Sequence, residues 1–579
     1  MIFALTTVGT VAGEGSATFN SQNSSLRTFM FGFGLNFPDS QDFAPSIIAG
    51  PTSGITPTSD YRYVYVYAKA GETINIGTNY TERNPDIAVI FPDGSSRTYD
   101  IPNRTSGTVG YIANYLQERN GPSTACKTTD CLNYYTPIKI DVTQEGIYKI
   151  AFYSSEWQQI NQIYDYSPKK SFLTTENLVS WAGTIAAWDV SVTDNSKNII
   201  PGRVYFYILY GMQSVGDFNR QSYSFLSFYV LTSDGVIYKT QYPQIDGGVF
   251  ALASNKRGLV DSITDTSIHH TALNTDDLNR FAVRNTSKDE YYRMFLNEPD
   301  RDLLNYLGLN SVKSIEISNF KFEGDYKNVT KISNGGTFSF LSSSGDGSFQ
   351  IDVVFNNGSK VSLSNSIVQG LNTITWNGKD NNGNIIGTPN QVVTGTASLN
   401  ILFGETHNIL YDIELNPGGI KIDVLNGPSA GDGIVYYDNS EKEINGYAFT
   451  ETFDGNDYSI SGINSKTNAA LSFNNFEGNL VLIDFWTYSK EQPNNNAIIV
   501  VTNEITSSIR VNKIWQDDEN RDGFRPERIT VRLLQDDTEY ATATIDDSAP
   551  NIWTYTFTDI PKYKTDGSAY VYYVEEVDY

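Results

Sequence analysis

The sequence predicts an all-β protein in which several β-sandwich domains, immunoglobulin-like or jelly-roll in type, follow one another in tandem. The chain has 579 residues, enough for roughly three to five domains. It contains 38 Tyr, 31 Phe and 46 Gly but only 4 Met, a composition typical of sheets joined by polar turns. Alternating apolar segments bounded by Gly, Asn and Asp recur along the chain, as strands and turns do.

The charge balance excludes two classes of partner. The formal net charge is −25, from 66 acidic and 41 basic residues. Contacts with phosphate need clustered Lys and Arg, so we expect neither nucleic acid nor an anionic membrane surface as a partner. Acidity spread over the whole length is typical of a soluble extracellular protein. It is compatible with calcium binding but does not require it.

The first segment of the chain has two interpretations. Residues 2–12 form a short apolar run before Gly13-Glu14-Gly15-Ser16, which fits the end of a signal peptide, so residues 1–16 are set apart as a residual signal segment. The first basic residue is Arg27, however, so the run serves equally well as a first strand. It is too short to cross a bilayer, and since no other long apolar segment is present, we expect no membrane span.

Residues 17–200 are predicted to form a large N-terminal β domain. Its clearest strand is 61–67, where Tyr alternates mostly with Val. We expect these tyrosines to pack on a sandwich face; the alternative is a flat aromatic platform for sugar rings or a host protein. Residues 111–119 predict a short helix.

Cysteine and histidine are rare in the chain. Cys126 and Cys131 are the only cysteines, and in an exported protein they predict a short disulfide loop, with two free thiols as the alternative. The only histidines are His269, His270 and His407, and none is spaced to complete a recognisable ligand set. We therefore do not expect zinc.

Residues 201–319 continue the β pattern. Ser233-Asp234-Gly235 between two apolar runs predicts a hairpin. The polar stretch 259–289 is a predicted long loop, and long loops in compact domains are often functional. Residues 300–307 predict a short helix.

Residues 320–416 are predicted to form an immunoglobulin-like sandwich. Its Trp376–Asn384 segment resembles the Trp-x-Gly-x-Asp-x-x-Gly hairpin of bacterial immunoglobulin-like modules. The oxygens of Asp380, Asn382 and Asn384 have the chemistry to hold calcium, although the spacing differs from an EF-hand. Turn formation is the favoured interpretation, and no other cofactor is expected.

Residues 417–505 show a weaker β pattern and provide the one motif of an enzyme. Gly427-Pro428-Ser429-Ala430-Gly431 matches the Gly-x-Ser-x-Gly nucleophile elbow, which needs a helix after it and a histidine downstream. Strand-like segments flank the motif, and no histidine follows His407, so we interpret it as a turn. Paired carboxylates are uninformative among so many acidic residues. The sequence predicts no enzyme.

Residues 506–579 carry the most specific pattern in the chain. Lys513 stands two residues before Trp515, an acidic turn ends in Arg525-Pro526, and a strand with Leu533-Leu534 follows. Next come Trp553-x-Tyr-x-Phe and a closing Tyr-x-Val-x-Glu that ends at Glu576. This order of features resembles the B-type domain of Gram-positive collagen adhesins, the Cna protein B-type family, over about the last 70 residues.

The resemblance implies a stalk or spacer module that forms an intramolecular isopeptide bond. In that family a first-strand Lys joins a last-strand Asn with the help of a buried acid, which implies Lys513 as nucleophile and Glu576 as the assisting acid. The chemistry needs an uncharged amine beside a carboxamide in a dry pocket. The sequence stops at Tyr579, before the strand that would carry the Asn, so the Asn partner is absent from this chain and the last sandwich is incomplete.

Together these features predict a non-catalytic cell-surface adhesin or pilus stalk component of a Gram-positive bacterium. Its partners would be a host extracellular protein or glycan and, through a further C-terminal region, the bacterial cell wall. The alternative function is a secreted carbohydrate-binding or carbohydrate-active protein. The expected division of the chain is 1–16, 17–200, 201–319, 320–416, 417–505 and 506–579.

Overall fold

The protein is described by a computed structural model. The described residues are 13–18, 28–31, 63–80, 86–103, 105–153, 184–213, 224–245, 249–261, 263–269, 272–274, 281–283, 290–313, 315–345, 347–389, 391–411, 415–440, 443–444, 447–448, 457–473, 481–493, 495–503, 505–546, 551–564 and 568–577. Residues 1–12 of the predicted signal segment and His270 lie outside them. Within these ranges strands predominate, and the predicted all-β class is confirmed. None of the described helices is long and apolar enough to cross a membrane.

The chain folds into two units, and each unit is built from separate pieces of sequence. Unit 1 comprises Met1–Lys313 and Gly404–Ser489, and unit 2 comprises Ser314–Phe403 and Lys490–Tyr579. Strands β25 (Val393–Tyr411) and β31 (Val481–Glu491) each contribute residues to both units.

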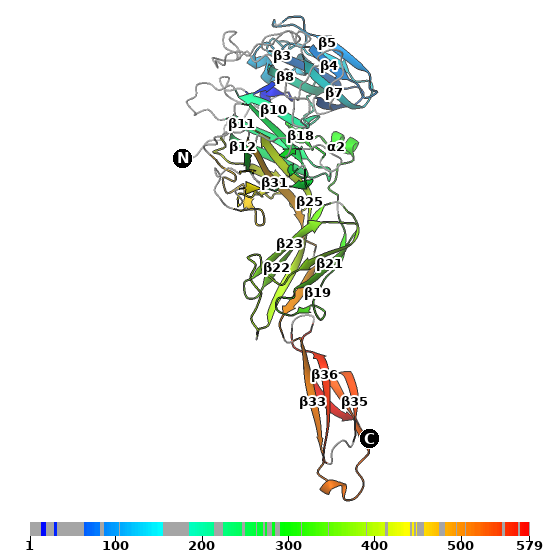
Figure 1. Ribbon diagram of the computed structural model, residues 1–579. Helices are drawn as coiled ribbons and strands as arrows, with labels where there is room; N and C mark the ends of the chain where they lie inside the picture. Colours follow the sequence, from blue (N-terminus) through cyan, green and yellow to red (C-terminus); the bar gives the residue numbers. More distant parts are fainter. Residues whose placement is uncertain are drawn as a thin grey trace. The chain divides into compact units, whose positions relative to one another are not determined.

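Unit 1 contains two large sheets (Figure 1). The first has the order β16-β31-β25-β13-β10-β1-β8-β3-β6, and the second β26-β12-β11-β18-β9-β2-β7-β4-β5. Besides β25 and β31, the unit 1 part of the first sheet consists of β16 (Ala272–Asn274), β13 (Val249–Asn255), β10 (Ile208–Gln213), β1 (Thr28–Phe31), β8 (Thr184–Thr193), β3 (Thr73–Tyr80) and β6 (Ile138–Asp141). The second consists of β26 (Lys421–Val424), β12 (Ile237–Ile245), β11 (Ser224–Leu231), β18 (Arg293–Phe295), β9 (Val204–Phe206), β2 (Val64–Ala68), β7 (Gly146–Tyr153), β4 (Asp86–Ile90) and β5 (Ser96–Asp100).

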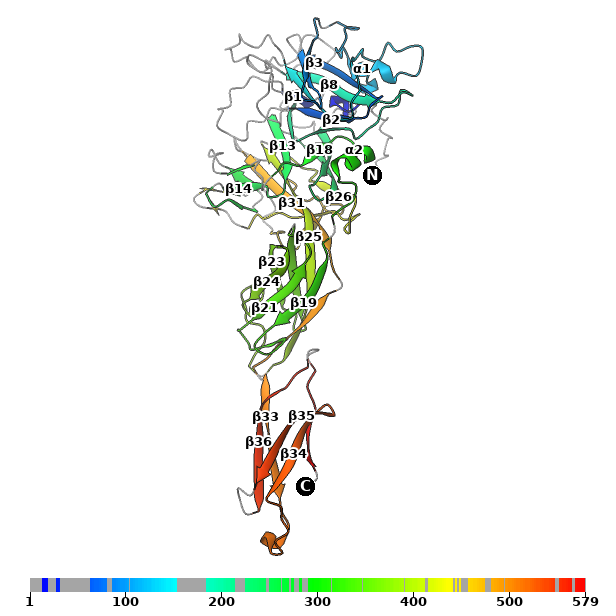
Figure 2. The same cartoon turned by 90° about the vertical axis from the view of Figure 1, so that its right-hand side faces the viewer.

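Small sheets and helices complete unit 1. The small sheets are β15 (Thr266–Ser267) with β14 (Leu259–Asp261) and β17 (Phe281–Val283), β27 (Ile434–Val435) with β30 (Ile463–Asn464), and β28 (Glu443–Ile444) with β29 (Tyr447–Ala448). Figure 2 shows the helix α1 (Tyr115–Asn120) beside β8. The helix α2 (Arg301–Leu307) starts where the Asp300 carboxylate accepts two backbone N–H groups and stops at Gly308, whose φ is 69°. Both helices lie within or close to the segments predicted for them.

The alternating tyrosines of β2 and of the residue just before it belong to the core of unit 1. Tyr63, Tyr65 and Tyr67 are each at most 4% exposed, because β2 pairs with β7 on one side and β9 on the other and is covered on both faces. The ring of Tyr65 stacks on Tyr205 of β9 with centroids 5.0 Å apart. The packing interpretation of these residues is confirmed, and a platform for an external ligand is excluded for side chains so deeply buried.

Unit 2 begins with a sandwich of two facing layers. One layer is β19 (Ile317–Glu323), β21 (Gly336–Ser342) and β24 (Gly370–Trp376); the other is β20 (Val329–Thr330), β22 (Ser348–Phe355), β23 (Lys360–Ser366), β32 (Asn496–Val501) and the first part of β25. Aromatic side chains fill the space between them. Phe355 of β22 meets Trp376 of β24 with ring centroids 5.7 Å apart, and Phe340 meets Phe349 at 4.8 Å.

The last part of unit 2 is a second, smaller sandwich (Figure 1). One layer is β33 (Thr506–Ile514) with β36 (Ile552–Pro561), and the other is β35 (Thr538–Asp546), β34 (Arg528–Gln535) and β37 (Tyr572–Val577). Its core places the fully buried Trp553 of β36 against Leu533 and Ile529 of β34 and Ile545 of β35. The strands alternate between core and solvent as the sequence pattern predicts.

The structural units differ from the linear division expected from sequence. Residues 17–200 and 201–319 share one sheet, because β2 pairs with β9. Part of the expected 417–505 domain joins them, because β26 pairs with β12 from Lys421 to Val424. The segment 490–505 instead supplies β32 to the sandwich of 314–403. The strands that pair within each unit are far apart in the sequence, so no change in local composition marks where a unit begins or ends.

Candidate functional site

Lys513 and Glu576 come together across the two layers of the C-terminal sandwich. Lys513 is on β33 and Glu576 on β37, and the Lys513 ammonium donates to both carboxylate oxygens, at 3.0 and 2.7 Å. The Lys513 Nζ also lies 4.5 Å from the centre of the Trp515 ring. The Lys513 side chain is 25% exposed and the Glu576 side chain is 33% exposed. A pair this open to solvent contributes about 0.2–1 kcal/mol, so its interest lies in chemistry rather than stability.

The loop at Asp380 is held by its own hydrogen bonds. One Asp380 oxygen accepts the backbone N–H groups of Asn382 and Asn384 at 2.9 and 2.8 Å, and the Asp380 N–H donates to the Asn384 carbonyl at 2.8 Å. This is a turn in which an Asp side chain bonds its own following backbone. A calcium role for Asp380, Asn382 and Asn384 stays a prediction.

Two other sequence features have clear places in the fold. Cys126 and Cys131 are joined by a disulfide bond. The Gly427–Gly431 motif is a turn in which the Ala430 N–H donates to the Gly427 carbonyl, and β27 rather than a helix follows it.

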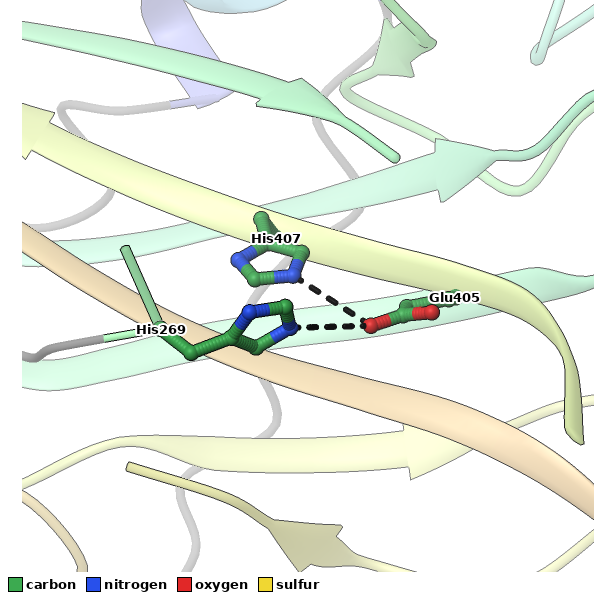
Figure 3. Close-up of side chains that lie close together, drawn as sticks. All are labelled: His269, Glu405 and His407. Atoms are coloured by element: carbon green, nitrogen blue, oxygen red, sulfur yellow. Dashed lines mark hydrogen bonds and ion pairs between the residues drawn. The ribbon is translucent and has the colours of Figure 1, made fainter. Parts of the chain in front are cut away.

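Unit 1 also brings together two of the three histidines and a glutamate (Figure 3). Glu405 and His407 are two residues apart on β25, so their side chains leave the same face of the sheet. His269 follows β15, and its ring reaches the same carboxylate oxygen as His407 does. Glu405 Oε1 lies 3.5 Å from His269 Nε2 and 3.4 Å from His407 Nε2.

The Asp484 carboxylate contacts the second ring nitrogen of His407 and so orients the ring. Asp484 on β31 lies 2.8 Å from the Nδ1 atom of His407, and its other oxygen accepts the Leu259 N–H at 2.9 Å. Both His407 and Asp484 side chains are fully buried. Backbone passes very close to this pair at Gly258, where a Cβ would be 2.0 Å from Asp484 Oδ2 and 2.3 Å from His407 Nδ1. Only glycine fits there, and its φ of 66° favours glycine as well.

Trp486 packs against both imidazole rings. It lies two residues after Asp484 on β31 and is 4% exposed. Its ring is stacked on His407 with centroids 5.4 Å apart and meets His269 edge-on at 5.0 Å. The indole therefore limits the rotation of both rings and keeps their nitrogens on the side of Glu405.

The electrostatics of the cluster favour a positive charge between its members. Burial alone would lower the pKa of His407, but the negative charges of Asp484 and Glu405 outweigh burial and raise the pKa to about 9. Burial would likewise raise the pKa of Glu405, but interactions with His269 and His407 outweigh it and lower the pKa to about 2.

Sequence reasoning missed this cluster because its members are far apart along the chain. Glu405 and His407 are two residues apart on β25, and Asp484 and Trp486 are two residues apart on β31, so period-two spacing is the signal that each pair carries in the sequence. The position of His269, 136 residues before Glu405, depends on the pairing of β13 with β25 and on the close approach at Gly258. The expectation that no histidine could complete a ligand set considered spacing along the chain alone, and the structure places two of them on one carboxylate.

Comparison with known proteins identifies one part of the chain. The family model of the Cna protein B-type domain matches residues 509–579. A collagen adhesin of Staphylococcus aureus is 41% identical over 68 residues, which are 11% of this chain and 6% of that protein. Residues 509–579 are a Cna protein B-type domain.

Solved structures of Cna B repeats are also similar to this chain. The crystal structure of a single B repeat unit of the collagen-binding surface protein of S. aureus is 27% identical, covering 20% of this chain and 66% of that one, with a TM-score of 0.12. The structure of two B repeat units is 18% identical, covering 40% and 62%, with a TM-score of 0.14. The identification of the B-type domain depends on the family match and the curated relative.

Proposed function

We propose that this chain is part of a cell-surface adhesion protein of a Gram-positive bacterium, with the B-type domain as a stalk module. The observation that carries the proposal is the B-type domain itself, whose Lys513 and Glu576 meet across the two layers. The relative that matches this domain is a collagen adhesin, and it supports a host extracellular protein as the partner. The role is recognition and load bearing, without catalysis.

The stalk role includes a covalent cross-link at Lys513. The Lys513 Nζ attacks the Cγ of an Asn side chain on a strand placed beside it, the new amide bond forms, and ammonia leaves. Glu576 lies 2.7 Å from the Nζ atom, where it can take the proton from the ammonium and pass it to the leaving group. A strand added beside these residues would also cover both side chains and remove the water that now reaches them.

The cross-link is tested by the intact mass of a chain extended beyond Tyr579 by about 30 residues, which allows one strand and its turn. The extended protein should be lighter than its calculated mass by about 17 Da, the mass of one ammonia. Lys513→Arg is the matched control, because it keeps the charge opposite Glu576 but cannot form the amide. An extended protein of unchanged mass would remove the cross-link from the proposal.

Adhesion itself needs a separate test. Intact cells of the source organism, probed with an antibody against unit 1 and then treated with protease, should lose the signal, since the protein would be on the outside. The purified full chain should bind at least one immobilised host matrix protein, with collagen tested first because the curated relative is a collagen adhesin. A signal that appears only after the cells are broken would refute the surface location.

A further inference from the structure

We propose that His269, Glu405 and His407 form a binding site for a divalent transition-metal ion, with zinc as the expected ion. Each of the three residues offers one ligand atom, and these atoms all lie within 4.8 Å of one another; the Nε2 atoms of both histidines face one oxygen of Glu405. Figure 3 shows both rings directed at the same carboxylate. The site is independent of the adhesin proposal and lies in unit 1, far along the sequence from the B-type domain.

The spacing of the donors fits a tetrahedral ion. Zinc binds histidine nitrogen and carboxylate oxygen at about 2.0–2.2 Å, so two ligands on a tetrahedron are about 3.4 Å apart. The Glu405 oxygen is 3.5 Å from His269 Nε2 and 3.4 Å from His407 Nε2. Both distances are long for hydrogen bonds, which are usually about 2.7–3.2 Å. A cation placed between the three atoms satisfies them better than direct contact does.

The buried nitrogen of His407 is the second observation that points to a ligand. Its side chain has no exposed area, and its Nε2 makes no hydrogen bond of acceptable geometry within the described part of the chain. Nδ1 lies 2.8 Å from the Asp484 carboxylate and donates its proton there, so Nε2 is the ring atom left to bind an ion on the side of Glu405. Without an ion, the protonated ring holds a proton on Nε2 that faces Glu405, and a metal ion bound between the two side chains replaces that proton.

Asp484 is the positioning residue that such a site requires. Histidines that bind metals nearly always donate their other ring N–H to a carboxylate or carbonyl, which fixes the orientation of the ring and strengthens the ligand. Asp484 is itself held in place by the Leu259 N–H, and Trp486 stacks on the His407 ring. His407 is therefore fixed before any ion arrives, which lowers the entropy lost on binding.

The ligand set selects the class of ion. Two imidazoles and one carboxylate suit zinc and its neighbours, whereas calcium and magnesium prefer sets made of oxygen alone. Three protein ligands leave a fourth position for water. The His269 side chain is 46% exposed and that of Glu405 19%, so ions and water can reach the cluster from the His269 side. A bound ion would fasten the segment after β15 to β25.

The test is titration of the purified full chain with zinc chloride after removal of metals by a chelator. We expect one zinc per chain with a dissociation constant of about 1 μM or tighter. His269→Ala and Glu405→Gln should weaken binding by at least about 100-fold. Because His269 is half exposed, its replacement should leave the circular dichroism and melting temperature unchanged. His270→Ala is the matched control and should bind like the parent.

Cobalt substitution provides a readout of the ligands themselves. A Co²⁺-loaded parent should show the strong visible absorption of a four-coordinate ion, and His269→Ala should lose it. Absence of stoichiometric zinc binding to the parent would overturn the proposal. So would binding that His269→Ala leaves unchanged, and loss of binding in His270→Ala would overturn the assignment of His269 as the ligand.

Discussion

The buried carboxyl of Glu14 makes the stability of unit 1 depend on pH. Glu14 is 1% exposed and accepts hydrogen bonds from the Gly202 N–H at 2.6 Å, the Asn297 amide at 3.0 Å and the Arg203 N–H at 3.2 Å. Burial outweighs these hydrogen bonds and raises the pKa of Glu14 from 4.5 to about 7, with a smaller contribution from the charge of Asp189.

The sign and size of the effect follow from this shift. Because the folded pKa lies above the unfolded one, the folded state holds more protons between these values, and stability is lost as the pH rises from 4.5 through about 7. With these two pKa values, the contribution of Glu14 falls by about 2.5 kcal/mol between about pH 5 and about pH 8. Glu14→Gln cannot ionise and should lose this part of the slope.

The measurement is urea unfolding of the full chain at several pH values between about 5 and 8, for the parent and for Glu14→Gln. The difference between their free energies of unfolding should change by about 2.5 kcal/mol over the range, while the contribution of Asp189 largely cancels. Asp93→Asn is the control, because the pKa of this exposed carboxyl is lowered and its effect lies below about pH 4. Equal slopes for the parent and Glu14→Gln would refute the reasoning.

Three further predictions concern single side chains. Arg203→Ala should lower the free energy of unfolding of unit 1, measured in urea, by about 3–5 kcal/mol, because it removes a buried guanidinium that pairs with several carboxylates. A loss below about 1 kcal/mol would mean that water hydrates these carboxylates in place of the guanidinium. Gly258→Ala should cost at least about 2 kcal/mol and lower the melting temperature, since its Cβ would meet Asp484 and its φ is positive, and an unchanged melting temperature would contradict that contact. Trp553→Ala should destabilise the B-type domain by about 3–5 kcal/mol, because the indole fills the core against Leu533. A protease added to the native variant should therefore cleave the B-type domain first. Cleavage of this domain at the same rate as in the parent would contradict the prediction.

Local patterns in the sequence predict much of the secondary structure. The Ser233-Asp234-Gly235 turn joins β11 to β12 as expected, since Gly235 has a φ of 82° that few other residues adopt. The α2 helix is marked by its Asp300 cap and by Gly308 at its end. The B-type domain is predicted as a whole, because its core positions and turns are contiguous in the chain.

Arrangements that depend on distant pairing could not be predicted. Nothing in the local sequence indicates that the strand of Lys421 pairs with β12, or that Asn255 lies opposite His407. The histidine cluster follows from this register, so its residues looked unrelated in the sequence. The buried state of Glu14 was equally hidden, because its partners Gly202 and Asn297 are contributed by later segments.

The discontinuity of unit 1 has a consequence for biosynthesis. When residue 313 leaves the ribosome, β12 and β13 exist, but their partners β26 and β25 have not yet been made. The unpaired edges must wait for the next ~110 residues, which takes about 5–20 s at ordinary rates of translation. Exposed strand edges of this kind attract other chains. A chaperone that holds the nascent chain during this interval should therefore raise the yield of folded protein more than one added after release.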